Sequence, residues 1–110
     1  MGILKQVYRD IIKDLNRTVK DANNSIDILK KQVELLGEDR IIQNKRVEIK
    51  QIIQDTTEDI KKLTDIKNNQ TVSNIIKAYS IIAHTQVKIR EVKELIYELD
   101  ENELLDKILR

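Results

Sequence analysis

Residues 8–36 read YRDIIKDLNRTVKDANNSIDILKKQVELL, and apolar side chains recur through this stretch every seven residues. One set of positions is β-branched: Ile12, Val19, Ile26 and Val33. A second set lies between them: Tyr8, Leu15, Ala22, Leu29 and Leu36. These sets are the a and d positions of a heptad repeat, in which a β-branched a and a leucine d are typical of coiled coils. The repeat continues through Asn23-Asn24-Ser25, which otherwise resembles a turn, so we predict one helix over about residues 3–36.

A second helix is predicted over about residues 39–67. Gly37 follows the last apolar residue of the first repeat, where glycine commonly ends a helix in the left-handed conformation. Glu38 and Asp39 then place acidic side chains at the N-terminus of the next helix. The apolar repeat resumes with its phase offset by one. One seam position is occupied by Ile42, Ile49, Thr56 and Leu63, and the other by Arg46, Ile53 and Ile60.

A third helix is predicted over about residues 71–99. Asn68-Asn69-Gln70 reads as a turn, and Thr71 or Ser73 can cap the helix that follows. Its seam consists of Ile75, Ile82, Ile89 and Ile96, with Ala78, Thr85, Val92 and Leu99 between them. The polar run 100–103 interrupts this pattern, and Asp100 and Glu103 have capping-box spacing. We therefore expect a short last helix over about 101–109, with a kink followed by continuation as the alternative.

The composition places these helices in one domain, residues 1–110. The chain has no Pro, Cys, Trp or Phe and only two Gly, whereas a sheet protein of this size needs frequent turn residues and aromatic side chains. Three helices joined by short turns pack most simply as an all-α, antiparallel three-helix bundle of coiled-coil type, here with a short C-terminal helix. The alternative architecture is a helical hairpin, or an extended rod, that completes its core only by dimerising.

Catalytic and metal-binding residue types are scarce. The chain has one histidine and no cysteine, which excludes histidine-rich and thiolate constellations. His84 falls at a c position, where we expect an exposed side chain without a special role, and no glutamate stands three residues before it as in di-iron bundles. We predict a non-enzymatic protein with no catalytic residue, no metal, no cofactor and no small-molecule substrate.

The basic residues suggest nucleic-acid association as an alternative function. They form two clusters: Arg40, Lys45, Arg46 and Lys50 in the second helix, and Lys88, Arg90 and Lys93 in the third. Against this alternative, the net charge is only +1, and no aromatic residue stands among these clusters for stacking on bases. Residues 94–110 are acidic, with six negative and two positive residues, and could pair with the basic start of the second helix in another subunit.

The stretch 68–87 points to a protein interface. Lys77 is its only formally charged residue, and a second apolar stripe runs beside the seam: Val72, Ile76, Tyr79 and Ala83, with Ile81 adding a g position. One bundle buries only one stripe of each helix, so we expect this surface to contact a second copy, a dimer being favoured, and/or another helical protein. The alternative is burial within the chain against a fourth element. Ile28 and Leu35, seven residues apart at c positions, suggest a second contact strip.

The sequence predicts no membrane span, because no run of 18 apolar residues occurs. A peripheral helix lying on lipid along Val72–Ala83 is a further alternative, although no belt of Lys or Arg flanks it. The lack of a signal-peptide core and of cysteine favours a cytoplasmic or other intracellular location.

Overall fold

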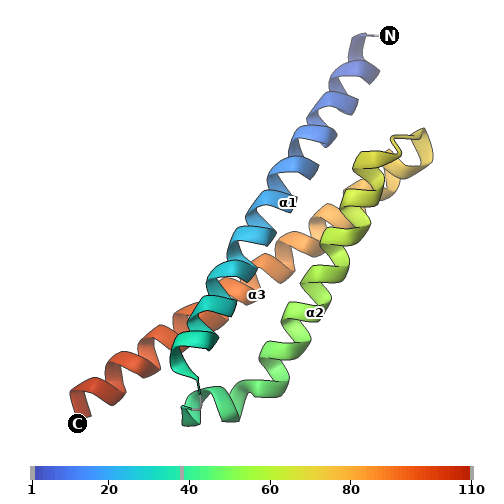
Figure 1. The fold of residues 1–110 in the computed structure, drawn as a ribbon. Coiled ribbons are helices and arrows are strands. Elements are labelled where there is room, and N and C mark those ends of the chain that lie inside the picture. The colour runs from blue at the N-terminus through green and yellow to red at the C-terminus, as the bar shows by residue number, and fades with distance from the viewer. Residues whose placement is uncertain (1, 38, 110) are drawn as a thin grey trace.

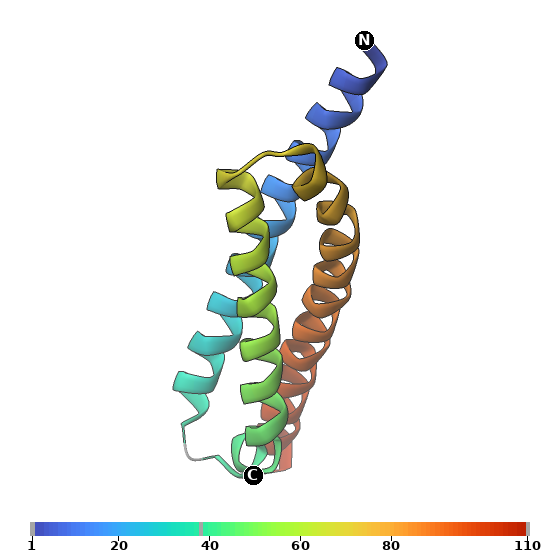
Figure 2. The same ribbon diagram turned by 90° about the vertical axis from the view of Figure 1, so that its right-hand side faces the viewer.

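Three α-helices make up almost the entire chain (Figures 1 and 2). The computed structural model describes residues 2–37 and 39–109, and the side chains of all of these except 2–4, 106 and 107. Helix α1 spans Gly2–Leu36, α2 spans Arg40–Asn68 and α3 spans Val72–Leu109. All three helices of the one chain pack against one another, which confirms the predicted all-α bundle and differs from the hairpin and rod alternatives.

Local sequence explains where each helix ends. Gly37 has φ +55° and donates its N–H to the carbonyl of Val33 at 2.9 Å, as expected for a left-handed C-terminal cap. The Asp39 carboxylate accepts a hydrogen bond from the N–H of Ile41 at 3.2 Å and so caps α2, whereas Glu38 lies outside the described residues. The hydroxyl of Thr71 caps α3 by accepting from the N–H of Asn74 at 3.2 Å.

The ion pairs between α2 and α3 give their relative direction. His84 pairs with Asp59, and Glu98 pairs with Lys45, so residue numbers fall along α2 as they rise along α3. The chain reverses at each short connection, as Figure 1 shows. The molecule is elongated, with principal extents of 65 × 21 × 17 Å.

The expected short helix over 101–109 is not a separate element, because α3 continues unbroken to Leu109. Polar residues alone do not end a helix, and neither Pro nor Gly stands in this segment. Asp100 does not act as a cap here: its carboxylate accepts a hydrogen bond from the side chain of Gln32, which also donates to the carbonyl of Ile96 at 3.1 Å. The last turns of α3 extend past the connection between α1 and α2 (Figure 1).

The interior contains two apolar clusters. The first combines Ile11, Leu15, Leu63, Ile66, Ile75, Ala78 and Ile82. The second combines Leu29, Ile42, Ile49, Ile52, Val92, Leu95 and Leu99. Several polar side chains are buried along the helices as well, namely Thr18, Ser25, Gln32, Thr56, Asp59 and Thr85. Both buried threonine hydroxyls on α2 and α3 donate to the carbonyl four residues earlier at 2.7 Å, so these polar groups are satisfied without a tertiary partner.

The buried stripe is rotated from the predicted seam on two helices. On α1 the d residues Leu15, Ala22 and Leu29 are fully buried as expected, but Ile12, Val19 and Val33 are only half-buried. On α2 the expected seam residues Ile53 and Ile60 are half-buried, and Arg46 is exposed. The g positions are buried in their place: Ile11, Thr18, Ser25 and Gln32 on α1, and Ile52, Asp59 and Ile66 on α2. A helix that packs against two neighbours buries residues on both sides of its d row, at the g as well as the a positions. Where the g residues are polar, the hydrophobic pattern does not reveal that they are buried.

Candidate protein interface

The second apolar stripe of α3 lies on the surface. Val72 is 71%, Ile76 66% and Tyr79 57% exposed, and Ala83 is exposed as well. These four residues are called the α3 stripe below. They follow the Thr71 cap and occupy the b and e positions beside the buried seam, so the helix presents them together while Ile75, Ala78 and Ile82 form the core. The described part of the chain leaves the α3 stripe exposed. This differs from the alternative in which a fourth element of the same chain buries it.

Ile81 does not belong to this surface. Its side chain is half-buried and packs against the first core cluster. The g position of α3 faces a neighbouring helix, as g positions do on α1 and α2. The prediction that Ile81 would contribute to an external interface is therefore not supported by its placement.

Ile28 and Leu35 are exposed, Leu35 by 87%. They line a shallow hollow of about 290 Å³ together with Ile96 and Asp100 of α3. This places them at the end of the molecule where α1 finishes, whereas the α3 stripe begins at the opposite end, next to the α2–α3 connection. The structure thus joins Ile28 with Leu35 but separates both from the α3 stripe.

Three of the four lysines of the two basic clusters lie beside carboxylates. Lys45 Nζ lies 2.6 Å from Glu98 and 3.6 Å from Glu48. The hydrogen bond to Glu98 is the main cause that raises the pKa of Lys45 above its usual value of 10.5, the nearby negative charges add to this rise, and partial burial opposes it. The ammonium group therefore remains charged, but its charge faces acidic side chains.

Lys88 and Lys93 of α3 are paired in the same manner. Lys88 Nζ lies 3.4 Å from Glu91 and 3.8 Å from Asp55, and Lys93 Nζ lies 3.5 Å from Asp21. The remaining members of the two clusters are exposed on the surface: Arg40, Arg46, Lys50 and Arg90. The predicted clusters therefore do not combine into one basic patch.

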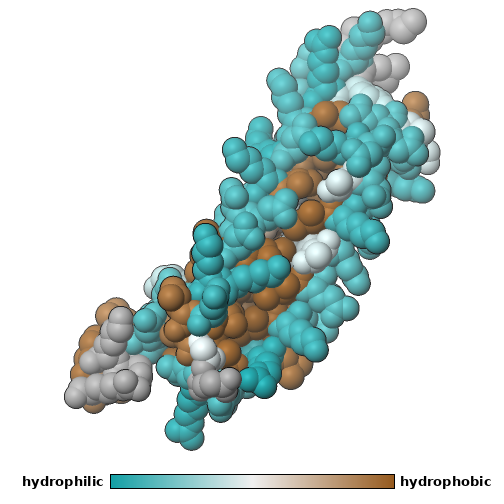
Figure 3. Space-filling model, viewed as in Figure 1, coloured by the Kyte–Doolittle hydropathy of each residue, from teal (hydrophilic) through white to brown (hydrophobic). Residues whose placement is uncertain are grey.

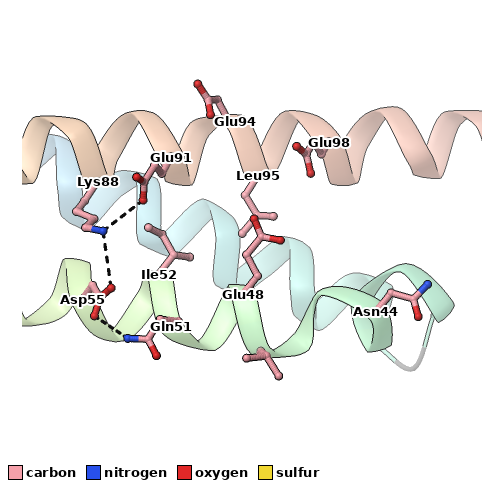
Figure 4. A pocket seen from close by; sticks show the side chains of 11 residues that line it. Asn44, Glu48, Gln51, Ile52, Asp55, Lys88, Glu91, Glu94, Leu95 and Glu98 are labelled. Atoms are coloured by element: carbon pink, nitrogen blue, oxygen red, sulfur yellow. Dashed lines mark hydrogen bonds and ion pairs between the residues drawn. The ribbon is translucent and has the colours of Figure 1, made fainter.

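The cleft between α2 and α3 is acidic (Figure 4). It has a volume of about 620 Å³, and its polar lining includes Glu48, Asp55, Glu91, Glu94 and Glu98. Figure 4 shows Lys88 bridging the two walls through Asp55 and Glu91. Among the side chains that the structure describes, no group of three or more potential ligands is placed to hold a metal ion.

A groove between α1 and α2 was not anticipated. Figure 3 shows an apolar stripe on the molecular surface between these two helices. Near Gly37 the groove has a volume of about 500 Å³ and an apolar lining, Val33, Ile42, Ile49 and Ile53, with Arg46 and Lys50 also at its wall. We call it the α1–α2 groove. The signal that could have revealed it is the aliphatic a row of α1, which was assigned to the closed core.

Comparison with protein families, with curated proteins and with solved structures finds no match to this chain. Within the described part of the chain, no helix combines the length and apolar character required to cross a bilayer.

Proposed function

We propose that this chain is a non-enzymatic helical module that works by binding proteins, and that it self-associates through the α3 stripe. The observation that carries the proposal is the exposure of Val72, Ile76 and Tyr79 in a stretch of twenty residues with one formal charge. Contiguous exposed apolar side chains are costly to hydrate and mark contact surfaces. Tyr79 suits such a surface because its ring is apolar and its hydroxyl tolerates water at the rim.

The proposed contact is helix against helix in a coiled-coil manner, with a dimer favoured. Small residues on the surface beside the apolar ones, Ser80 and Ala83, allow a second helix to approach closely. An equivalent α3 from a second copy presents the same stripe, and a twofold axis makes such a surface self-complementary. A helix from another protein with a matching apolar stripe is the alternative partner.

Nucleic-acid association is the alternative function, and the geometry supports it less. Lys45, Lys88 and Lys93 would have to leave carboxylates within 4 Å to bind phosphate. A protein that neutralises several phosphates shows an affinity that falls steeply with salt. A gel-shift titration at two salt concentrations distinguishes this alternative from protein binding.

The test of self-association is the double substitution Ile76→Glu and Tyr79→Glu. Two carboxylates in a desolvated contact should weaken association by several kcal/mol, while the core residues beneath the stripe remain in place. Light scattering should report a smaller assembly for the variant than for the parent chain, with unchanged circular dichroism. Lys77→Glu, between the two positions but off the α3 stripe, is the matched control and should remain associated. A parent chain that is already monomeric would refute the proposal.

A further inference from the structure

The a row of α1 is covered only in part by the other helices of the chain. Three of its four aliphatic residues, Ile12, Val19 and Val33, stay half-buried, whereas Ile26 is buried. Ile53 of α2 is half-buried as well and lines the same groove as Val33. Aliphatic residues sustained at a positions over four heptads are what a helix presents to another helix. Figure 3 shows apolar surface exposed between α1 and α2. The groove has the composition of a helix-binding site.

The end of the groove near Gly37 selects for an acidic helix. Its lining of about 500 Å³ contains Arg46 and Lys50 and no carboxylate. The cleft on the other side of α2 contains five carboxylates. Helix α2 therefore separates a basic groove from an acidic one, and an apolar helix with negative charges complements only the basic one.

The last turns of α3 have that composition. Their apolar side chains are exposed, with no described part of the chain folded over them: Leu104, Leu105, Ile108 and Leu109. Residues 100–109 contain four acidic residues and one basic residue, a net charge of −3. These turns project past the α1–α2 connection (Figure 1).

We propose that residues 100–109 of one copy dock in the α1–α2 groove of a second copy, and that the second copy returns the same contact. Ten helical residues extend about 15 Å, and the part of α2 that lines the groove, residues 42–54, extends about 20 Å. The donor helix and the acceptor groove lie at the same end of the molecule, so one twofold axis can satisfy both at once. This docking depends on self-association, as the proposed function does, but it uses a surface separate from the α3 stripe.

The absence of cysteine from the chain permits a clean cross-linking test. The full-length variants Ile53→Cys, in the groove, and Leu105→Cys, in the docking helix, are mixed in a mild thiol–disulfide redox buffer. The expected product is a disulfide between the two different variants, exceeding the product of either variant with itself. Lys61→Cys, at an exposed position of α2, replaces Ile53→Cys as the control and should yield at least about fivefold less cross-linked product with Leu105→Cys, since a disulfide requires Cβ atoms about 4 Å apart.

The same experiment separates this docking from the α3 stripe. The two cysteine substitutions are repeated in chains that also carry Ile76→Glu and Tyr79→Glu, and the cross-link should still form. Arg46→Glu with Lys50→Glu should reduce the cross-link about tenfold or more through like-charge repulsion. Equal cross-linking of Ile53→Cys and Lys61→Cys, or no effect of the charge reversals, would overturn the docking. Either result would leave the light-scattering test of the α3 stripe unaffected.

Discussion

At the scale of single residues, His84 is the clearest departure from the sequence interpretation. Its c position predicts an exposed side chain without a special role, and the side chain is indeed 58% exposed. Yet Nδ1 lies 2.5 Å from Oδ2 of Asp59, whose side chain is only 5% exposed. His84 therefore provides a hydrogen-bond partner for the carboxylate of Asp59, which is buried between α2 and α3.

We expect His84→Ala to destabilise the fold by about 1–3 kcal/mol, because it removes a hydrogen-bond partner from a buried acceptor. Gln86→Ala, at an exposed position on the same helix, should change the free energy of unfolding by less than about 0.5 kcal/mol. Urea denaturation of both variants measures the difference. Equal stability of the two variants would show that water satisfies Asp59 as well as His84 does.

At the scale of elements, Lys45 joins the first turns of α2 to α3 through Glu98. A folded-state pKa above the usual 10.5 means that the charged form is favoured by folding. The resulting stabilisation is fully present below about pH 10.5 and is lost as the pH rises through the raised pKa of the folded state. The carboxylate of Glu48, 3.6 Å away, acts in the same direction.

Lys45→Met should therefore reduce stability at pH 8, by up to about 1 kcal/mol for so accessible a pair. The difference between parent and variant should shrink at pH 11, because above pH 10.5 the unfolded chain loses the lysine proton before the folded state does. Denaturant unfolding at both pH values is the measurement, and Lys61→Met supplies the background of general alkaline destabilisation. A difference that stays constant or grows with pH would contradict the assigned role of the bond to Glu98.

Helix α3 shows why an element boundary is difficult to read from a polar interruption. Residues 100–103 break the apolar pattern, but a pattern reports which face is buried rather than whether the backbone stays helical. Gln32 of α1 holds this turn by donating to Ile96 and Asp100. Helix α3 therefore continues beyond Leu99, the last residue of its apolar seam.

At the scale of the whole molecule, stability depends on d residues that contact both neighbouring helices. Leu29 is fully buried in a cluster to which α2 and α3 also contribute. Leu35 stands on the same helix but is 87% exposed. The two leucines are thus matched in chemistry and differ in burial.

Leu29→Ala should destabilise the protein by about 2–5 kcal/mol through lost apolar contact and the cavity that remains. Leu35→Ala should cost less than about 0.5 kcal/mol. Thermal and urea unfolding, followed by circular dichroism, measure both. A small loss for Leu29→Ala would mean that the d row of α1 does not form the core.

The sequence alone determined the helical class, the number of long helices and both connections. Heptad spacing, Gly37 and the polar run before Thr71 are local signals, and their physics does not depend on the rest of the fold. The sequence also identified the α3 stripe as a second apolar row, in addition to the a and d residues that one bundle buries. These features were accessible because backbone propensity and periodicity act over a few neighbouring residues.

Only the tertiary structure decided which flank of each d row is buried. The packing of the three helices buried g residues such as Thr18 and Asp59, and left the a residues Ile12, Val19 and Val33 of α1 half-buried. It also paired Lys45, Lys88 and Lys93 with carboxylates on neighbouring turns and helices. Burial and ion pairing depend on distances between residues far apart in the chain, and a heptad pattern carries no information about those distances.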